Sequence, residues 1–312
     1  MTAAVSFDDR RLGILVTGRI GHRGSDSTSF FDLMLGLRQT FPFSEVTFST
    51  AHEPGSEIRR KLAAINCTIA VATFLEDPTL SYGMNSLIRQ SQQVQLGLEV
   101  FSVAVKQVVR VRSDWLITNQ TKFREFVSSS ADAPSLTFLD VNWPKFPWMP
   151  NPWQGNDYLT LGDVHSVSQF WAPFQDLEIR ANKKVRSLFS RQFHYYVDCN
   201  EKSVEQMLFR RYFGTMLGIP VQGNFFSELY WWALSEQMTR AIPYEIAGVS
   251  PPAGALSKSP IAAVFFGHRN TSKRRAFFAA QVVTGYLIGA LFFWLHPMWV
   301  WPRLISRAAT KQ

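Results

Sequence analysis

The sequence predicts an α/β fold with a mainly parallel sheet and helices on both faces. Apolar runs of strand length alternate with segments of helical spacing between residues 12 and 112, in the order that parallel sheets require. The 312 residues are 46% hydrophobic and 14% aromatic, so one large domain or two ordinary domains can bury an ample core. This composition excludes disordered, collagen and coiled-coil chains.

The first two strands enclose a glycine-rich loop and a helix. Residues 12–17 (LGILVT) form an apolar run that ends in the glycines of GRIGHRG, which predicts a buried strand followed by a loop. Residues 28–41 carry apolar side chains at helical spacing, and Pro42 ends that helix because it cannot donate a backbone hydrogen bond. Residues 45–50 (EVTFST) alternate as a strand does.

Two further strands complete the alternation. After a polar, helix-compatible segment, residues 68–74 (TIAVATF) indicate a third buried strand. Residues 84–100 have the pattern of a helix. Residues 107–112 (QVVRVR) have the pattern of a strand, which ends at Ser113 and Asp114.

The remainder of the chain changes character twice. Residues 136–175 are rich in Trp, Pro, Asn and Gly, which is typical of a long ordered loop or a set of short strands. Residues 176–245 return to helical patterns. We therefore expect a domain over residues 1–245, a linker over residues 246–272 and a separate segment over residues 273–312.

The C-terminal segment has the features of a membrane anchor. Residues 276–297 contain no charged side chain, and about 20 apolar residues are enough to cross a bilayer. Trp294 and Trp299 lie near its far end and basic residues flank it, which suits the two membrane interfaces. The alternatives are a buried helix of a soluble domain, a helix that lies in the interface, and a re-entrant helix that is broken near Pro297.

The positive charge of the chain gathers in the same segment. The formal net charge is +8, yet residues 1–245 are neutral, and residues 246–312 hold eight basic side chains and no acid. Each basic residue near an anionic leaflet is worth roughly 1 kcal/mol, so a membrane is the favoured partner and nucleic acid the least favoured. The first residues carry acids and lack a long apolar core, so we expect the domain in the cytoplasm.

Several catalytic and metal-binding patterns do not occur in the sequence. Cys67 and Cys199 are too few for a disulfide framework or a zinc cluster, and we expect both to be small buried side chains. GxSxG and HExxH motifs are missing, and the six histidines are scattered. The loop GRIGHRG follows neither the P-loop nor the dinucleotide-binding pattern, so it either contacts phosphate or is only a turn that needs glycine.

The strongest candidate site lies within residues 84–114. Asn85 and Arg89 stand near the start of the predicted helix, and Asp114 follows the strand after it. Ligands of open α/β sheets bind at the carboxyl ends of the strands. Asp114 could therefore hold a divalent metal on a pyrophosphate, and Arg89 could neutralise the phosphates. The alternative is an aspartate that caps the next turn.

These residues resemble a segment of the WavE lipopolysaccharide-synthesis family. The family pattern N-x-x-R-Q, followed by G-L and then R-S-D, is resembled here by Asn85, Arg89, Gln90, Gly97, Leu98, Arg112, Ser113 and Asp114, with one residue more between Asn85 and Arg89 than the pattern has. The segments LVTGRI, LGLRQTFPFSEVTFSTAHE, NPWQGNDYLTLGD and VEQML resemble further blocks of that family in the same order. Together they cover about residues 12–210.

The resemblance implies a GT-A-like, Rossmann-like glycosyltransferase of bacterial surface polysaccharide assembly. Such an enzyme moves a sugar from a nucleotide-sugar donor to a lipid-linked or saccharide acceptor at the cytoplasmic face of the inner membrane. The resemblance implies that the donor-binding residues are Gly18, Asn85, Arg89, Arg112 and Asp114.

The acidic motif of this fold binds the metal, Mn²⁺ or Mg²⁺, and here it would be R-S-D, with Asp114 toward the metal. One carboxylate is a weak metal site, so a metal-independent enzyme, in which Arg112 or Arg89 balances the diphosphate, stays open. A catalytically inactive, membrane-tethered sugar-nucleotide-binding or scaffold protein with a degenerate transferase fold is the alternative function.

An inverting transferase also needs a carboxylate base. Glu205 fits, because Ser203 can cap the helix that Glu205 opens, although a first-turn glutamate that only favours the helix dipole has the same pattern. Asp157 and Asp163 are the other candidates. Three tryptophans of the same region could stack on sugar rings or simply pack under the loop: Trp143, Trp148 and Trp153.

Overall fold

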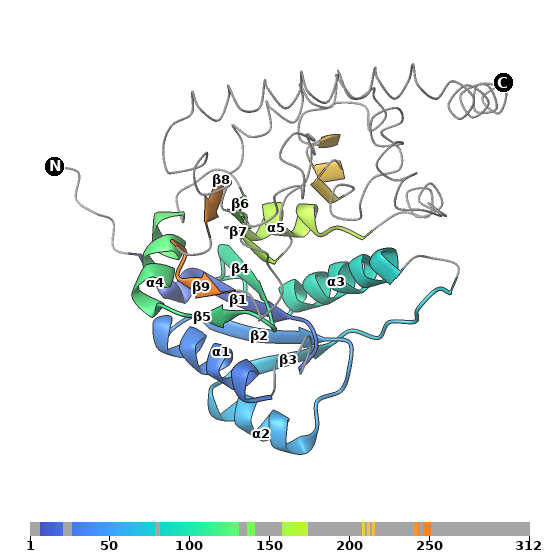
Figure 1. The fold of residues 1–312 in the computed structure, drawn as a ribbon, viewed down its shortest axis with the longest axis horizontal. Helices are drawn as coiled ribbons and strands as arrows, with labels where there is room; N and C mark the ends of the chain where they lie inside the picture. Colours follow the sequence, from blue (N-terminus) through green and yellow to red (C-terminus); the bar gives the residue numbers. More distant parts are fainter. Residues whose placement is uncertain are drawn as a thin grey trace, which may run out of the picture.

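A seven-stranded sheet with helices on both faces organises the part of the chain that the structure describes (Figure 1). The computed structural model describes residues 7–20, 27–78, 82–130, 136–140, 158–173, 208–209, 211–212, 214–215, 240–243 and 246–250. The predicted α/β class with a mainly parallel sheet is therefore confirmed over this part of the chain.

The strand order of the central sheet is β3-β2-β1-β4-β7-β6-β8. Its strands are β1 (Leu12–Thr17), β2 (Glu45–Thr50), β3 (Cys67–Val71), β4 (Gln107–Arg112), β6 (Thr137–Asp140), β7 (Leu159–Asp163) and β8 (Arg240–Pro243). The pairs β1–β2, β2–β3, β1–β4 and β6–β8 are parallel, and β7 is antiparallel to both β4 and β6. Of the described strands in this seven-stranded sheet, β7 alone runs against the others.

The helices divide between the two faces of this sheet. They are α1 (Ser27–Thr40), α2 (Ser56–Ala64), α3 (Tyr82–Glu99), α4 (Gln120–Ser129) and α5 (Val164–Phe170). Apolar side chains of α1, α2 and α4 pack in one cluster with Ile14, Val16 and Val109, whereas those of α3 and α5 pack in a second cluster with Leu15 and Val108. Side chains alternate along a strand, so β1 and β4 serve both clusters and are buried on both faces.

Close packing of α3 against β1 depends on Gly97. A β-carbon at this position would overlap the side chain of Leu15, so any larger residue would push the helix away from the sheet. The helix α3 begins at Tyr82, in the chain that leaves the carboxyl end of β3. Its first turns therefore lie at the carboxyl end of the parallel strands. This position brings Asn85 and Arg89 to the edge where the candidate site was predicted.

Most predicted elements agree with the structure. The strands predicted at residues 12–17, 45–50 and 107–112 are confirmed with the same bounds. The strand predicted at residues 68–74 is Cys67–Val71 in the structure, and its last hydrogen bond to β2 runs from Ala72 N to Thr50 O at 2.8 Å, where β2 ends. Within the Trp- and Pro-rich stretch, the described residues form short strands, β6 and β7, and the helix α5.

The predicted linker begins inside the folded domain. The strand β9 (Val249–Ser250) pairs antiparallel with β5 (Leu116–Ile117), and both Ala247 and Val249 are buried. Burial of these side chains joins residues 246–250 to the domain rather than to a linker. The predicted anchor at residues 273–312 lies outside the described residues. Among the helices that the structure describes, none is long and apolar enough to cross a membrane.

Candidate functional site

The order of the strands reverses next to β1. The chain passes from β1 outward to β2 and β3 on one side, and then returns to place β4 on the other side. Open α/β sheets bind ligands in the crevice at such a reversal, beyond the carboxyl ends of the two strands. Here those ends are Thr17 and Arg112, which are paired residues in the β1–β4 ladder.

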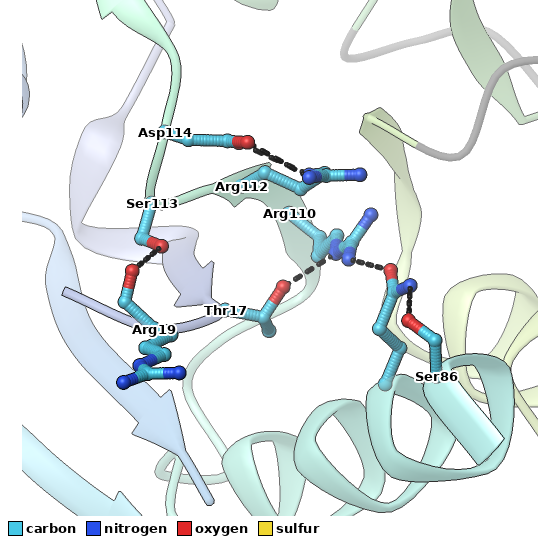
Figure 2. Close-up of polar contacts among 8 residues, drawn as sticks. Thr17, Arg19, Ser86, Arg110, Arg112, Ser113 and Asp114 are labelled. Carbon is cyan, nitrogen blue, oxygen red and sulfur yellow. Dashed lines mark hydrogen bonds and ion pairs between the residues drawn. The ribbon is translucent and has the colours of Figure 1, made fainter. Parts of the chain in front are cut away.

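Gly18 turns the chain at the end of β1. Its φ of +136° favours glycine, and a β-carbon would overlap the hydroxyl of Ser113. Ser113 fixes the turn because its N–H donates to Thr17 O at 2.9 Å and its Oγ donates to Arg19 O at 3.0 Å (Figure 2). The turn at residue 18 therefore requires glycine. The close approach of the Gly18 backbone to Ser113 joins the ends of β1 and β4.

Arg112 and Asp114 form a buried ion pair beside this turn. Arg112 donates from Nε to Asp114 Oδ1 at 3.0 Å and from Nη2 to Asp114 Oδ2 at 2.8 Å (Figure 2). The two side chains are 13% and 2% exposed. Arg112 also lies over the ring of Tyr158, with its Cζ 4.7 Å from the centroid. Removal of one partner from a buried pair costs about 3–5 kcal/mol, so the pair holds both groups firmly.

Arg110 is a third charged residue of this site and was not singled out by the sequence analysis. Its guanidinium is fully buried, donates from Nε to Thr17 Oγ1 at 2.8 Å and from Nη2 to Gln90 Oε1 at 2.9 Å, and lies 4.4 Å from the ring centroid of Trp171. The strand period of two puts Arg110 and Arg112 on one face of β4. That spacing in QVVRVR was a signal in the sequence that could have identified it.

Asn85 and Arg89 contact the segment that follows β3. The side chain of Asn85 accepts from Asp77 N at 3.0 Å and donates to Asp77 O at 2.9 Å. Arg89 lies 3.6 Å from Glu76 and 5.9 Å from the ring centroid of Phe74. The structure thus places both residues at the carboxyl edge, where they hold the segment that follows β3. Whether they also bind a donor stays a prediction.

The described residues offer little to a divalent metal. Both carboxylate oxygens of Asp114 are bonded to Arg112, and a cation at these oxygens would have to displace a guanidinium. Among the residues that the structure describes, no three His, Cys, Asp or Glu side chains gather as a metal site. Asp114 as a metal ligand stays a prediction, and a single carboxylate that is already paired does not fit it well.

The candidate bases fall into two groups. Glu205 and Asp157 lie outside the described residues, as do the three loop tryptophans. Asp163 is described, and it lies away from Asp114. Since β7 runs antiparallel, Asp163 pairs with Gln107, at the opposite edge of the sheet from Asp114. There its Oδ1 accepts from Ser166 N at 2.9 Å and caps α5.

Comparison with known proteins gives distant structural similarity only. No protein-family model matches the chain, and no curated protein matches it. A mannosyltransferase from Pyrobaculum calidifontis, in complex with GDP-Man and Mn²⁺, has a TM-score of 0.36 at 10% identity and covers 88% of this chain and 87% of its own. A 4-diphosphocytidyl-2C-methyl-D-erythritol synthase from Anaerococcus prevotii has a TM-score of 0.38 at 10% identity and covers 61% and 85%.

A third structure is a glycosyltransferase involved in glycosylation of the major capsid of PBCV-1. Its TM-score is 0.32 at 14% identity, and it covers 52% of this chain and 65% of its own. Similarity at this level does not assign a family or an activity. The comparisons do not point to the WavE family, and that resemblance stays a prediction. The functional argument therefore depends on the geometry of the site.

Proposed function

We propose that the chain is a GT-A-like glycosyltransferase that uses a nucleotide-sugar donor. One observation carries the proposal: the strand order reverses between β1 and β4, and the ends of these strands hold the Gly18 turn and the buried Arg112–Asp114 pair side by side. A crevice at this place is where open α/β sheets bind nucleotides, and fixed guanidinium groups recognise phosphate.

The proposed reaction is a displacement at the anomeric carbon of the donor sugar. The acceptor hydroxyl oxygen forms a bond to this carbon while the bond from the carbon to the diphosphate oxygen breaks. The nucleoside diphosphate leaves with the bonding electron pair, and positive side chains at the carboxyl edge stabilise its charge. The hydroxyl proton passes to a carboxylate base, for which we propose Glu205 or Asp157. If a divalent metal binds at Asp114, it would supply further charge to the diphosphate.

We extend the proposal to the biological role from the sequence alone. The resemblance of residues 12–210 to the WavE family supports a role in lipopolysaccharide or surface polysaccharide synthesis, with a lipid-linked or saccharide acceptor. The eight basic residues and the uncharged stretch after residue 246 support attachment to the cytoplasmic face of the inner membrane.

A thermal-shift screen of nucleotide sugars, with and without Mn²⁺, tests the donor assignment. A ligand at 100 times its Kd stabilises the folded state by about 2.7 kcal/mol, which raises the Tm by about 5–10 °C for a domain of this size. We expect at least one hit in wild type, its loss in Arg112→Gln and its retention in Arg60→Gln. Arg60 is an exposed arginine of α2 and matches the change in charge. A screen without any hit would contradict the proposal.

Release of nucleoside diphosphate separates the enzyme from the inactive binding protein. The single acid of R-S-D, already paired with Arg112, is the observation that favours the inactive alternative. With a hit from the screen and a panel of lipid-linked and saccharide acceptors, the transferase should release diphosphate in proportion to glycosylated product. Binding of several donors with neither hydrolysis nor transfer would support the inactive protein instead.

A further inference from the structure

We propose that Arg112 supplies the positive charge that faces the donor diphosphate, and that Asp114 is there to hold this guanidinium rather than a divalent metal. The inference rests on the proposed function, because it names the group that receives the diphosphate in the same donor site. Three features of residues 110–114 lead to it: the pairing of Asp114, the position of Arg112 and the charge of Arg110.

Both carboxylate oxygens of Asp114 already accept hydrogen bonds from Arg112. Oδ1 accepts from Arg112 Nε at 3.0 Å and Oδ2 accepts from Nη2 at 2.8 Å, and the carboxylate side chain is only 2% exposed. A divalent cation on these oxygens would lie against a like charge in a poorly solvated place. In the described part of the chain, no cluster of three His, Cys, Asp or Glu could complete its coordination. The carboxylate is therefore suited to an arginine.

Arg112 is fixed at the place where a diphosphate would lie. It ends β4 and pairs with Thr17, the last residue of β1, so it stands next to the Gly18 turn. Asp114 holds one edge of its guanidinium, and the ring of Tyr158 lies 4.7 Å from its Cζ. A guanidinium held in this way keeps its positive charge at one fixed place beside the Gly18 turn. Because it is held before the ligand arrives, little side-chain freedom is lost on binding.

Arg110 makes the site positive in spite of the Asp114 carboxylate. Two arginines and one aspartate in residues 110–114 give a formal charge of +1. Arg110 is fully buried, so it acts on a ligand through its field and not by contact. The field of a buried charge is screened by salt less than that of an exposed one. A diphosphate at Arg112 therefore meets a net positive site without any metal ion.

Calorimetric titration of the full chain with UDP, GDP, CDP and dTDP, in excess EDTA and in Mn²⁺, tests the inference. We expect the Kd of the best nucleotide to agree within about threefold between the two conditions. Arg112→Gln should weaken binding by about 30- to 100-fold, as loss of charge-assisted hydrogen bonds does. Asp114→Asn should weaken it by only about fivefold, because this variant loses an anchor but also removes the negative charge that opposes the phosphates.

The two accounts of Asp114 predict different sizes of these effects. A metal site predicts that EDTA abolishes binding in wild type and that Asp114→Asn loses as much affinity as Arg112→Gln. Either result would overturn the inference. The comparison with EDTA uses the wild-type protein, so it does not depend on the folding of a variant. Arg112→Lys keeps the charge without the planar fork, so we expect an intermediate loss of about tenfold. Absence of binding in both conditions would overturn the proposed function, and this inference with it.

Discussion

The two edges of the central sheet use the same residue type for different purposes. Asp114 follows β4 at the carboxyl edge, where it is buried and bonded through both oxygens to Arg112. Asp163 ends β7 at the amino edge, where it is exposed and caps α5 through one oxygen. The comparison teaches that a strand-end aspartate takes its role from the edge at which it lies and from the charge beside it.

Both edges bury polar groups, but they satisfy them differently. At the carboxyl edge the buried residues Thr17, Arg110, Ser113 and Asp114 are bonded across strands and helices. At the amino edge the buried carboxylate of Asp9 accepts a backbone hydrogen bond from Phe43 N at 3.2 Å. Burial of a charge is costly unless it is paired, and the buried Arg112–Asp114 ion pair is the feature that makes the carboxyl edge the candidate site.

Removal of Arg112 is the largest effect that we expect. Arg112→Met leaves the Asp114 carboxylate buried without its guanidinium, which should lower the free energy of unfolding by about 3–5 kcal/mol in a urea titration. The double variant Arg112→Met, Asp114→Leu should recover most of this loss because no lone charge remains. A loss under about 1 kcal/mol for the single variant would show that the pair is not tightly held.

A methyl group at Gly18 should also damage the carboxyl edge. Gly18→Ala meets both an unfavourable φ of +136° and the hydroxyl of Ser113, so we expect a loss of about 2–3 kcal/mol. Gly36→Ala is the matched control, since a β-carbon there has its nearest neighbours at 3.8 Å and alanine favours the helix α1. Thermal unfolding should show opposite signs for the two variants, and equal changes would contradict this account of the turn.

Asp163 should matter less, and only for stability. Asp163→Ala removes the cap of α5 and should cost about 1 kcal/mol. Because Asp163 lies at the other edge from Arg112, donor affinity measured by calorimetry should stay within about twofold of wild type. A loss of donor binding in this variant would contradict the assignment of the donor site to the carboxyl edge.

Cys67 gives the smallest expected effect. Burial raises the pKa of its thiol to about 12, so at pH 8 its labelling by iodoacetamide should be about a thousandfold slower than that of an ordinary cysteine. The folded state favours the protonated thiol. Its contribution to stability is therefore full below the ordinary pKa of 9.0 and is lost as the pH rises from there to about 12. Fast labelling of Cys67 in native protein, located by mass spectrometry, would contradict its burial.

The sequence predicts the sheet better than it predicts the site. The strand at 12–17 is identified by an apolar run, and those at 45–50 and 107–112 by their strand-like patterns, because each of these signals is local in the chain. The direction of β7 has no such signal, so the sequence could not place Asp163 at the edge opposite Asp114. Arg110 was missed because its role depends on Thr17, Gln90 and Trp171, which are distant in the chain.

Hydrogen exchange with and without a bound nucleotide sugar tests the central claim most directly. We expect the donor to slow amide exchange at the carboxyl edge, in peptides that span Thr17 to Ile20 and Arg110 to Trp115. Exchange at the amino edge, in peptides that span Ser102 to Lys106 and Asp163 to Ser166, should not change. Protection at the amino edge, or unchanged exchange at the Gly18 turn with donor bound, would contradict the donor site proposed here.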